Sequence, residues 1–178
     1  MPELRPFAEV THLFETFAHT AWRLEVQRGY TSDRTSAKRQ RYLLGEHLGF
    51  DPEHPWHANV RRQTEAGKQF ERVRIVDDPP TQDQRFLLAS GLGNVEAGED
   101  IRNLNRGQAQ RHGLPDFDFW LFDSRVLVRF HHDADGATLG VEVTQEPAEV
   151  LRGCQVRDAA WHHAIRTAEF QTRVLSPM

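Results

Sequence analysis

The segment Leu114–Asp123, with the sequence LPDFDFWLFD, places carboxylates inside an aromatic run. Side chains alternate between the two faces of a strand, so Phe117 and Phe119 share one face while Asp118 and Trp120 share the other. Because both faces are apolar, the pattern predicts a central strand that is covered on both sides. A charge buried there without a partner is costly, so Asp118 requires cationic neighbours from elsewhere in the chain.

Arginines that could supply this charge lie in other apolar segments. In the segment ERVRIV, the same alternation places Val73 and Ile75 on one face, and Arg72 and Arg74 on the other. Arg102 lies in a further short extended segment. We therefore predict an arginine–aspartate cluster at the centre or at one edge of a mixed sheet.

The bulk composition indicates a folded protein of one domain. The chain has 178 residues, and its eleven Phe and four Trp supply a core although hydrophobic residues make up only 38%. We expect a single domain over residues 1–178, with an N-terminal helical part to about residue 67 and a sheet core over about 68–171. The net charge of −4 argues against direct nucleic-acid binding. The single cysteine, the missing signal peptide and the missing long apolar run predict a cytoplasmic protein without a membrane partner.

Hydrophobic periodicity and turn residues predict the order of elements. The expected class is α/β, a mixed sheet of about five to seven strands flanked by helices. The predicted strands are 21–26, 70–76, 101–104, 116–123, and a hairpin of 125–131 and 137–144. The predicted helices are 7–18, 34–47, 55–66, one beginning at Thr81 or Asp83 and interrupted at 91–94, and one from Pro147 to about Ile165. Residues 106–115 are expected as a loop, and those from about Thr172 as a fraying tail.

The sequence shows no recognised catalytic or metal-binding motif. Adjacent histidines, such as His131–His132 and His162–His163, point in different directions on a strand or a helix, so we interpret the histidines as surface or structural residues and expect no metal and no cofactor. Cys154 lies in a helical pattern without an evident base, as an inert buried thiol does. A nucleophile elbow and a phosphate-binding glycine loop are both missing.

The charged cluster is therefore the candidate site. Its members come from separate segments that only the fold could bring together: Arg23, Glu25, Arg72, Arg74, Arg85, Glu99, Arg102, Asp118 and Asp123. One interpretation is a structural ion-pair network. The other is a pocket for a small anionic ligand, because arginine forks match carboxylate and phosphate groups.

Four phrases resemble a known family. They are WRLE (22–25), ERVRIV (71–76), NVEAGEDIR (94–102) and LPDFDFWLFD (114–123). They are similar to an actinobacterial, Streptomyces-type domain family of unknown function that is often encoded beside helix-turn-helix regulators. This chain has Asp83 where the family has tyrosine, Leu87 where it has an acidic residue, and no clear match to the acidic residue expected shortly after Tyr30. The resemblance implies a regulatory context and a helix-turn-helix protein as partner, with a ligand contact that this chain has lost or changed.

The order of elements also resembles one half of a phospholipase D-like domain, with an extra N-terminal helix–strand–helix part. The active signature of that fold is His-x-Lys followed, after four further residues, by Asp, and the histidine is the nucleophile. Aligned on Asp123, the histidine and lysine positions are Asp116 and Asp118. A carboxylate in place of the lysine repels phosphate, so the resemblance implies a catalytically dead half-domain of the kind that regulators carry as sensors.

These observations lead to one functional hypothesis and two alternatives. We expect a non-catalytic regulatory or small-ligand-sensing protein that works with a separate DNA-binding partner. The first alternative is an enzyme of unassigned class that acts on a small anionic substrate, with Glu25, Glu99 or Asp118 as acid or base. The second is an RNA-acting member of a toxin–antitoxin pair that uses the basic run Lys38–Arg41.

Overall fold

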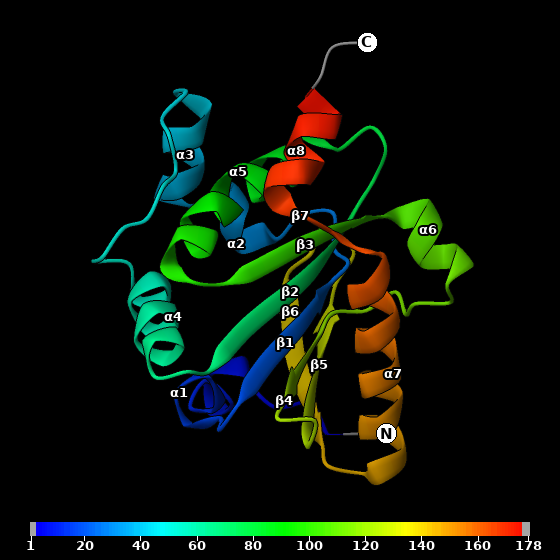
Figure 1. Cartoon of the computed structure of the whole chain (residues 1–178). Helices are drawn as coiled ribbons and strands as arrows, with labels where there is room; N and C mark the ends of the chain where they lie inside the picture. The colour runs from blue at the N-terminus through cyan, green and yellow to red at the C-terminus, as the bar shows by residue number, and fades with distance from the viewer. Residues whose placement is uncertain (1–2, 176–178) are drawn as a thin grey trace.

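The computed structural model describes residues 3–175 and shows a mixed seven-stranded sheet with helices on both faces (Figure 1). The strands are β1 (Thr20–Glu25), β2 (Gln69–Val76), β3 (Asp100–Asn105), β4 (Phe119–Phe122), β5 (Val126–His132), β6 (Thr138–Thr144) and β7 (Ile165–Arg166). Their order in the sheet is β6-β5-β4-β1-β2-β3-β7. This confirms the predicted α/β class and the position of the hairpin β5–β6 at one side.

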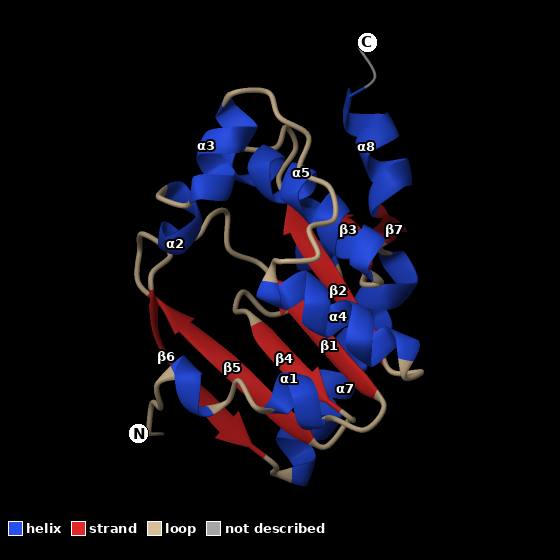
Figure 2. Cartoon of the chain, turned by 90° about the vertical axis from the view of Figure 1, so that its left-hand side faces the viewer, coloured by secondary structure: helices blue, strands red, loops and turns tan. Residues whose placement is uncertain are grey.

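Helices cover the sheet unequally on its two faces. They are η1 (Phe7–Glu9), α1 (Leu13–Thr16), α2 (Thr31–Arg34), α3 (Ala37–Leu43), α4 (Pro55–Glu65), α5 (Gln82–Ala97), α6 (Arg106–Arg111), α7 (Pro147–His163) and α8 (Thr167–Leu175). Figures 1 and 2 show α1 and α4 on one face and α7 on the other. Within residues 3–175, none of these helices has the length and apolar character needed to cross a membrane.

Strand β1 lies at the centre of the sheet. It pairs in parallel with β2 and antiparallel with β4, and β2 pairs in parallel with β3. Residues 20–25 therefore belong to the middle of the sheet, although they lie within the N-terminal third of the chain. The register of β1 and β2 places Arg23 opposite Arg72 and Glu25 opposite Arg74, so these four side chains share one face.

Each face of the sheet has its own apolar core. Trp22, Val73 and Phe119 pack with residues of α6 and α7 on one face. Phe70 and Trp120 pack with residues of α1 and α4 on the other face. Strand alternation thus has the predicted result, and the second face carries the charged side chains beside its aromatic core.

The helical predictions in the first half of the chain require correction. Residues 7–18 form the two short turns η1 and α1, whose apolar residues still pack on the sheet. The predicted helix 34–47 is divided into α2 and α3, because Ser36 accepts a hydrogen bond from the amide of Arg39 and begins a new helix. The predicted interruption at 91–94 is wrong: α5 continues through it. There a Cβ on Gly93 would lie 2.7 Å from the carbonyl oxygen of Gly49, so glycine permits close packing of the helix.

Three predictions in the second half also require correction. The expected loop after Asn105 begins with α6, because the side chain of Asn105 accepts a hydrogen bond from the amide of Gly107. The aromatic strand is confirmed, but β4 comprises only Phe119–Phe122. The last predicted helix ends at His163 and is followed by β7 and α8, so the expected tail is helical to Leu175 and otherwise lies outside the described residues.

Candidate functional site

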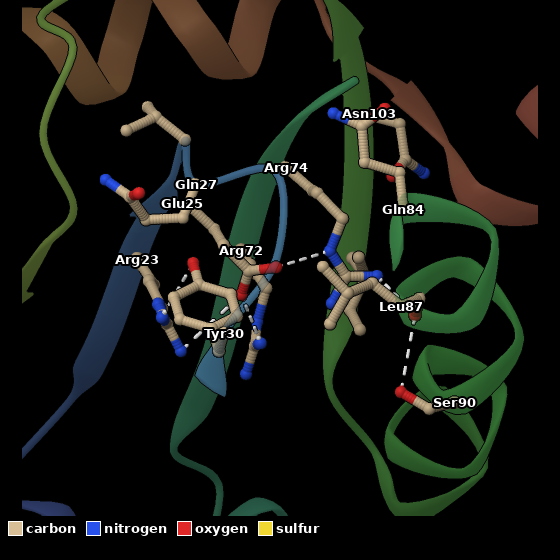
Figure 3. Close-up of polar contacts among 12 residues, drawn as sticks. Arg23, Glu25, Gln27, Tyr30, Arg72, Arg74, Gln84, Leu87, Ser90 and Asn103 are labelled. Atoms are coloured by element: carbon tan, nitrogen blue, oxygen red, sulfur yellow. Dashed lines mark hydrogen bonds and ion pairs between the residues drawn. The ribbon is translucent and has the colours of Figure 1, made fainter. Parts of the chain in front are cut away.

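Glu25 is the centre of a buried ion-pair network (Figure 3). Its Oε1 accepts a hydrogen bond from Arg74 Nε at 2.6 Å, and its Oε2 accepts one from Arg72 Nη1 at 2.8 Å. Arg23 Nη1 lies 3.5 Å from the same Oε2. The parallel register of β1 and β2 makes this possible, because it places a carboxylate beside arginines that point to the same face.

The loop before β3 supplies the second carboxylate. Arg72 Nε donates to Glu99 Oε1 at 2.7 Å, and Trp56 Nε1 on α4 donates to Glu99 Oε2 at 3.3 Å. Arg74 also contacts α5, where its Nη1 donates a hydrogen bond to the carbonyl oxygen of Leu87 at 2.6 Å. Both arginines of β2 are therefore bound within the protein.

Asp118 closes the other end of the network. Its Oδ2 accepts a hydrogen bond from Arg23 Nη2 at 3.0 Å and another from the Tyr30 hydroxyl at 2.5 Å. Its Oδ1 accepts from the backbone amides of Val26 at 2.7 Å and Gln27 at 3.3 Å. The buried charge that the sequence predicted thus has four donors.

The network is charge-balanced and almost closed to solvent. It consists of three arginines and three carboxylates: Arg23, Arg72, Arg74, Glu25, Glu99 and Asp118. Asp118 is 0% exposed and Glu25 is 1% exposed, whereas the side chain of Arg23, at 16%, is the most accessible. Because each positive charge has a carboxylate partner, the network has no surplus cation to attract an anion.

The pKa values follow from these contacts. Burial raises the pKa of Glu25, but the guanidinium groups of Arg74, Arg23 and Arg72 outweigh burial and hold that pKa well below its ordinary value. Burial and the carboxylates of Glu25 and Asp118 raise the pKa of Tyr30 well above its ordinary value. Tyr30 therefore stays protonated and donates to Asp118 at neutral pH.

Three predicted members lie outside this network. The register pairs Arg102 with Val73, so Arg102 occupies the opposite face, where its guanidinium lies 3.7 Å from the Trp161 ring centroid. Arg85 lies on α5, with its Nε 3.5 Å from the carbonyl oxygen of Pro80. Asp123 follows β4 with a φ of 52° and accepts hydrogen bonds from the amides of residues 18, 19 and 20. The six remaining predicted members come together.

A second ion-pair cluster was not predicted. Asp77 follows β2 and accepts hydrogen bonds from Arg28 Nε and Arg106 Nε, each at 2.6 Å. Arg106 also donates to the carbonyl oxygen of Val26 at 2.8 Å. A signal was available, because these charged residues follow the ends of parallel strands, and such ends meet at one edge of a sheet.

Tyr30 and Trp56 were likewise missed as network donors, since their contacts depend on the loop and helix that carry them.

The histidines have structural contacts. His57 is 1% exposed; its Nδ1 accepts from the amide of Asp51 and its Nε2 contacts Asn94 Oδ1, both at 3.0 Å. His112 and His163 stack with their ring centroids 3.7 Å apart. In the part of the chain that the structure describes, no three His, Cys, Asp or Glu side chains are grouped so that they could hold a metal ion.

Comparison with solved structures supports the fold assignment. The chain is similar to a phospholipase D family member, Nuc from Salmonella typhimurium, with a TM-score of 0.52 and 11% sequence identity, over 89% of this chain and 88% of that chain. At this identity the likeness shows the fold alone. Among curated proteins, none matches this sequence. The sequence does match the domain of unknown function DUF6879 over residues 8–172, and the chain therefore belongs to the DUF6879 family.

Proposed function

We propose that this protein is a non-catalytic regulatory or small-ligand-sensing protein that works with a separate DNA-binding partner. One observation carries the proposal. When the chain is aligned on Asp123, the resemblance to the phospholipase D signature places Asp118 at the position of its lysine. The Asp118 carboxylate is paired with Arg23 and accepts a hydrogen bond from the Tyr30 hydroxyl within a closed network. The fold resembles that of the enzyme, while a carboxylate bound inside the protein stands in place of the lysine that would face phosphate.

Electrostatics explain why this arrangement suits a non-catalytic role. Phosphoryl transfer depends on cationic groups that face the phosphate and on a positioned nucleophile. At the nucleophile position this chain has Asp116, an exposed carboxylate, and at the lysine position it has Asp118. Asp116 adds exposed negative charge that repels a phosphate group, and Asp118, bound inside the network, provides no cation to attract one.

The assignment of DNA contacts to a partner is supported by the charge distribution. The net charge is −4. The basic run on α3 is partly engaged within the protein, because Arg39 is buried and its Nη2 lies 2.9 Å from Asp83 Oδ1. Lys38 is half-buried, and burial lowers its pKa. These contacts disfavour the use of the basic residues of α3 as a binding surface for RNA or DNA. The family resemblance adds the expectation that a helix-turn-helix protein is encoded nearby.

The enzymatic alternative receives less support from the site. A general acid or base works best with a pKa near the working pH, whereas the arginines hold the pKa of Glu25 low. Hydrolysis of bis(4-nitrophenyl) phosphate tests this alternative. We expect the purified protein to match the buffer blank, with no difference between wild type and Glu25→Gln. Hydrolysis by wild type above the buffer blank would contradict the non-catalytic role.

Co-purification tests the regulatory role directly. A tagged chain, produced at its native level in its own host, is expected to recover a helix-turn-helix protein identified by mass spectrometry. An unrelated tagged protein at the same level is the control for nonspecific capture. Recovery of the bait alone, in repeated preparations, would contradict the proposed partner.

A further inference from the structure

A large cavity lies on the face of the sheet opposite the ion-pair network. It has a volume of about 840 Å³, is partly open to solvent, and is lined by α7, the hairpin β5–β6, the segment before β4 and the N-terminal segment. Its apolar lining includes Phe117, Phe119, Leu127 and Val156. The volume falls within the range of small-molecule sites, which combine apolar walls with a few polar groups.

Arg129 of β5 lines this cavity and has no ionic partner within residues 3–175. Its guanidinium carbon lies 3.9 Å from the centroid of the Phe117 ring, and its buried Nε has no hydrogen-bond partner among the described residues. Glu142 lies opposite Arg129 on β6, but its carboxylate is bound by His131 Nε2. A guanidinium held over an aromatic ring, with its buried Nε lacking a hydrogen-bond partner among the described residues, is a group to which a bound acceptor would add hydrogen bonds.

The charges around the cavity restrict the ligand. Arg5 and Arg152 add positive charge to that of Arg129, while Glu3, Glu142 and Glu149 also line the cavity. The acidic side chains disfavour a multiply charged anion. The lining instead suits one anionic group beside an apolar body.

We propose that this cavity binds a small amphipathic monoanion, a carboxylate or sulfonate with an aromatic or aliphatic body. The anionic group accepts hydrogen bonds from Arg129, and the apolar body packs against Phe119 and Leu127. This inference deepens the proposed sensing role and rests on it, since it gives that role a ligand class and a site.

Two fluorescent probes separate the charge contribution from the apolar one. The anion 8-anilinonaphthalene-1-sulfonate and the neutral N-phenyl-1-naphthylamine share the same ring system. We expect both to bind wild type. Arg129→Gln is expected to raise the Kd of the sulfonate about tenfold or more, and to leave the Kd of the neutral probe within about twofold. Arg125→Gln is the matched control, because Arg125 is exposed on the same hairpin and does not line this cavity.

A second variant locates the binding. Ala148 is exposed and lines the cavity, so Ala148→Trp fills the site without disturbing a packed core residue and is expected to remove the binding of both probes. Unchanged binding in this variant would overturn the assignment of the site. An Arg129→Gln protein that binds the sulfonate as wild type does would overturn the role of Arg129, and failure of both probes to bind wild type would overturn the cavity as a ligand site. These results come from the purified chain alone, so they are independent of whether a DNA-binding partner co-purifies.

Discussion

Glu25 Oε1 and Arg74 Nε lie 2.6 Å apart on adjacent parallel strands, and both side chains are almost completely buried. Parallel register, rather than closeness in sequence, brings them together. The same carboxylate also binds Arg72, so a single glutamate holds two arginines in place. Removal of such a group leaves uncompensated buried charge, which is more costly than the loss of one hydrogen bond.

We predict that Glu25→Gln makes stability less sensitive to acid. The folded-state pKa of Glu25 is depressed below its unfolded value of about 4.3, so ionised Glu25 stabilises the native state above that pH. This contribution declines as the pH falls below about 5 and the unfolded chain takes up its proton first. At pH 7 the variant is expected to lose about 3–5 kcal/mol of unfolding free energy, and the difference from wild type should shrink towards pH 3.

Urea denaturation across this pH range measures the effect. Asp77 and Asp123 also have lowered pKa values, so wild type alone does not isolate Glu25. The difference between wild type and variant does isolate it, because the other carboxylates are common to both. A difference that stays constant from pH 7 to pH 3 would show that the charge of Glu25 is not stabilising.

A second prediction contrasts two arginines that the sequence presented as equivalent. Arg72→Ala removes a buried cation that binds two carboxylates, and is expected to cost about 3–5 kcal/mol. Arg102→Ala loses a contact with Trp161 and a partly exposed pair with Asp100, and is expected to cost about 1 kcal/mol. Thermal melts of both variants test this difference. Equal losses of stability in the two variants would indicate that Arg102 belongs to the buried network.

Asp123 is predicted to act as an acceptor for the turn before β1. Asp123→Ala leaves the amides of residues 18, 19 and 20 without their acceptor and is expected to cost about 1–3 kcal/mol. Asp123→Asn retains an acceptor and tolerates the φ of 52°, so it should lie between wild type and Asp123→Ala. Equilibrium unfolding of the three proteins tests this order of stability. An Asp123→Ala variant as stable as wild type would show that Asp123 does not stabilise the turn as a hydrogen-bond acceptor.

Strand alternation predicts the faces of the two arginines on β2 and of the aspartate directly before β4. It placed Arg72 and Arg74 together, and Asp118 with Trp120, as the structure confirms. It did not give the register between strands, and the register decides that Arg102 faces Trp161 instead of Glu99. A pattern within one strand contains no information about its offset from a neighbour.

Loop geometry was the other feature of the structure that the sequence did not predict. Tyr30 reaches Asp118 because the chain turns back after β1, and no local pattern specifies that path. The glycines of α5 were interpreted as helix breakers, whereas they allow the helix to pack closely, with a Cβ on Gly91 placed 3.2 Å from Arg74 Nη1. The path of the loop that carries Tyr30 and the continuity of α5 therefore depend on long-range packing, which local propensity does not specify.

The most direct test of the closed network is the unfolding free energy of Asp118→Ala compared with Asp116→Ala. The two aspartates are two residues apart, but Asp118 is 0% exposed and binds Arg23, whereas Asp116 is exposed. We predict a loss of about 3–5 kcal/mol for Asp118→Ala, because it removes the shorter of the two carboxylate contacts of Arg23 and unbalances the buried charge, and a change within about 0.5 kcal/mol for Asp116→Ala. If Asp118→Ala unfolds with the same free energy as Asp116→Ala, the carboxylate does not neutralise a buried charge and the closed network is contradicted.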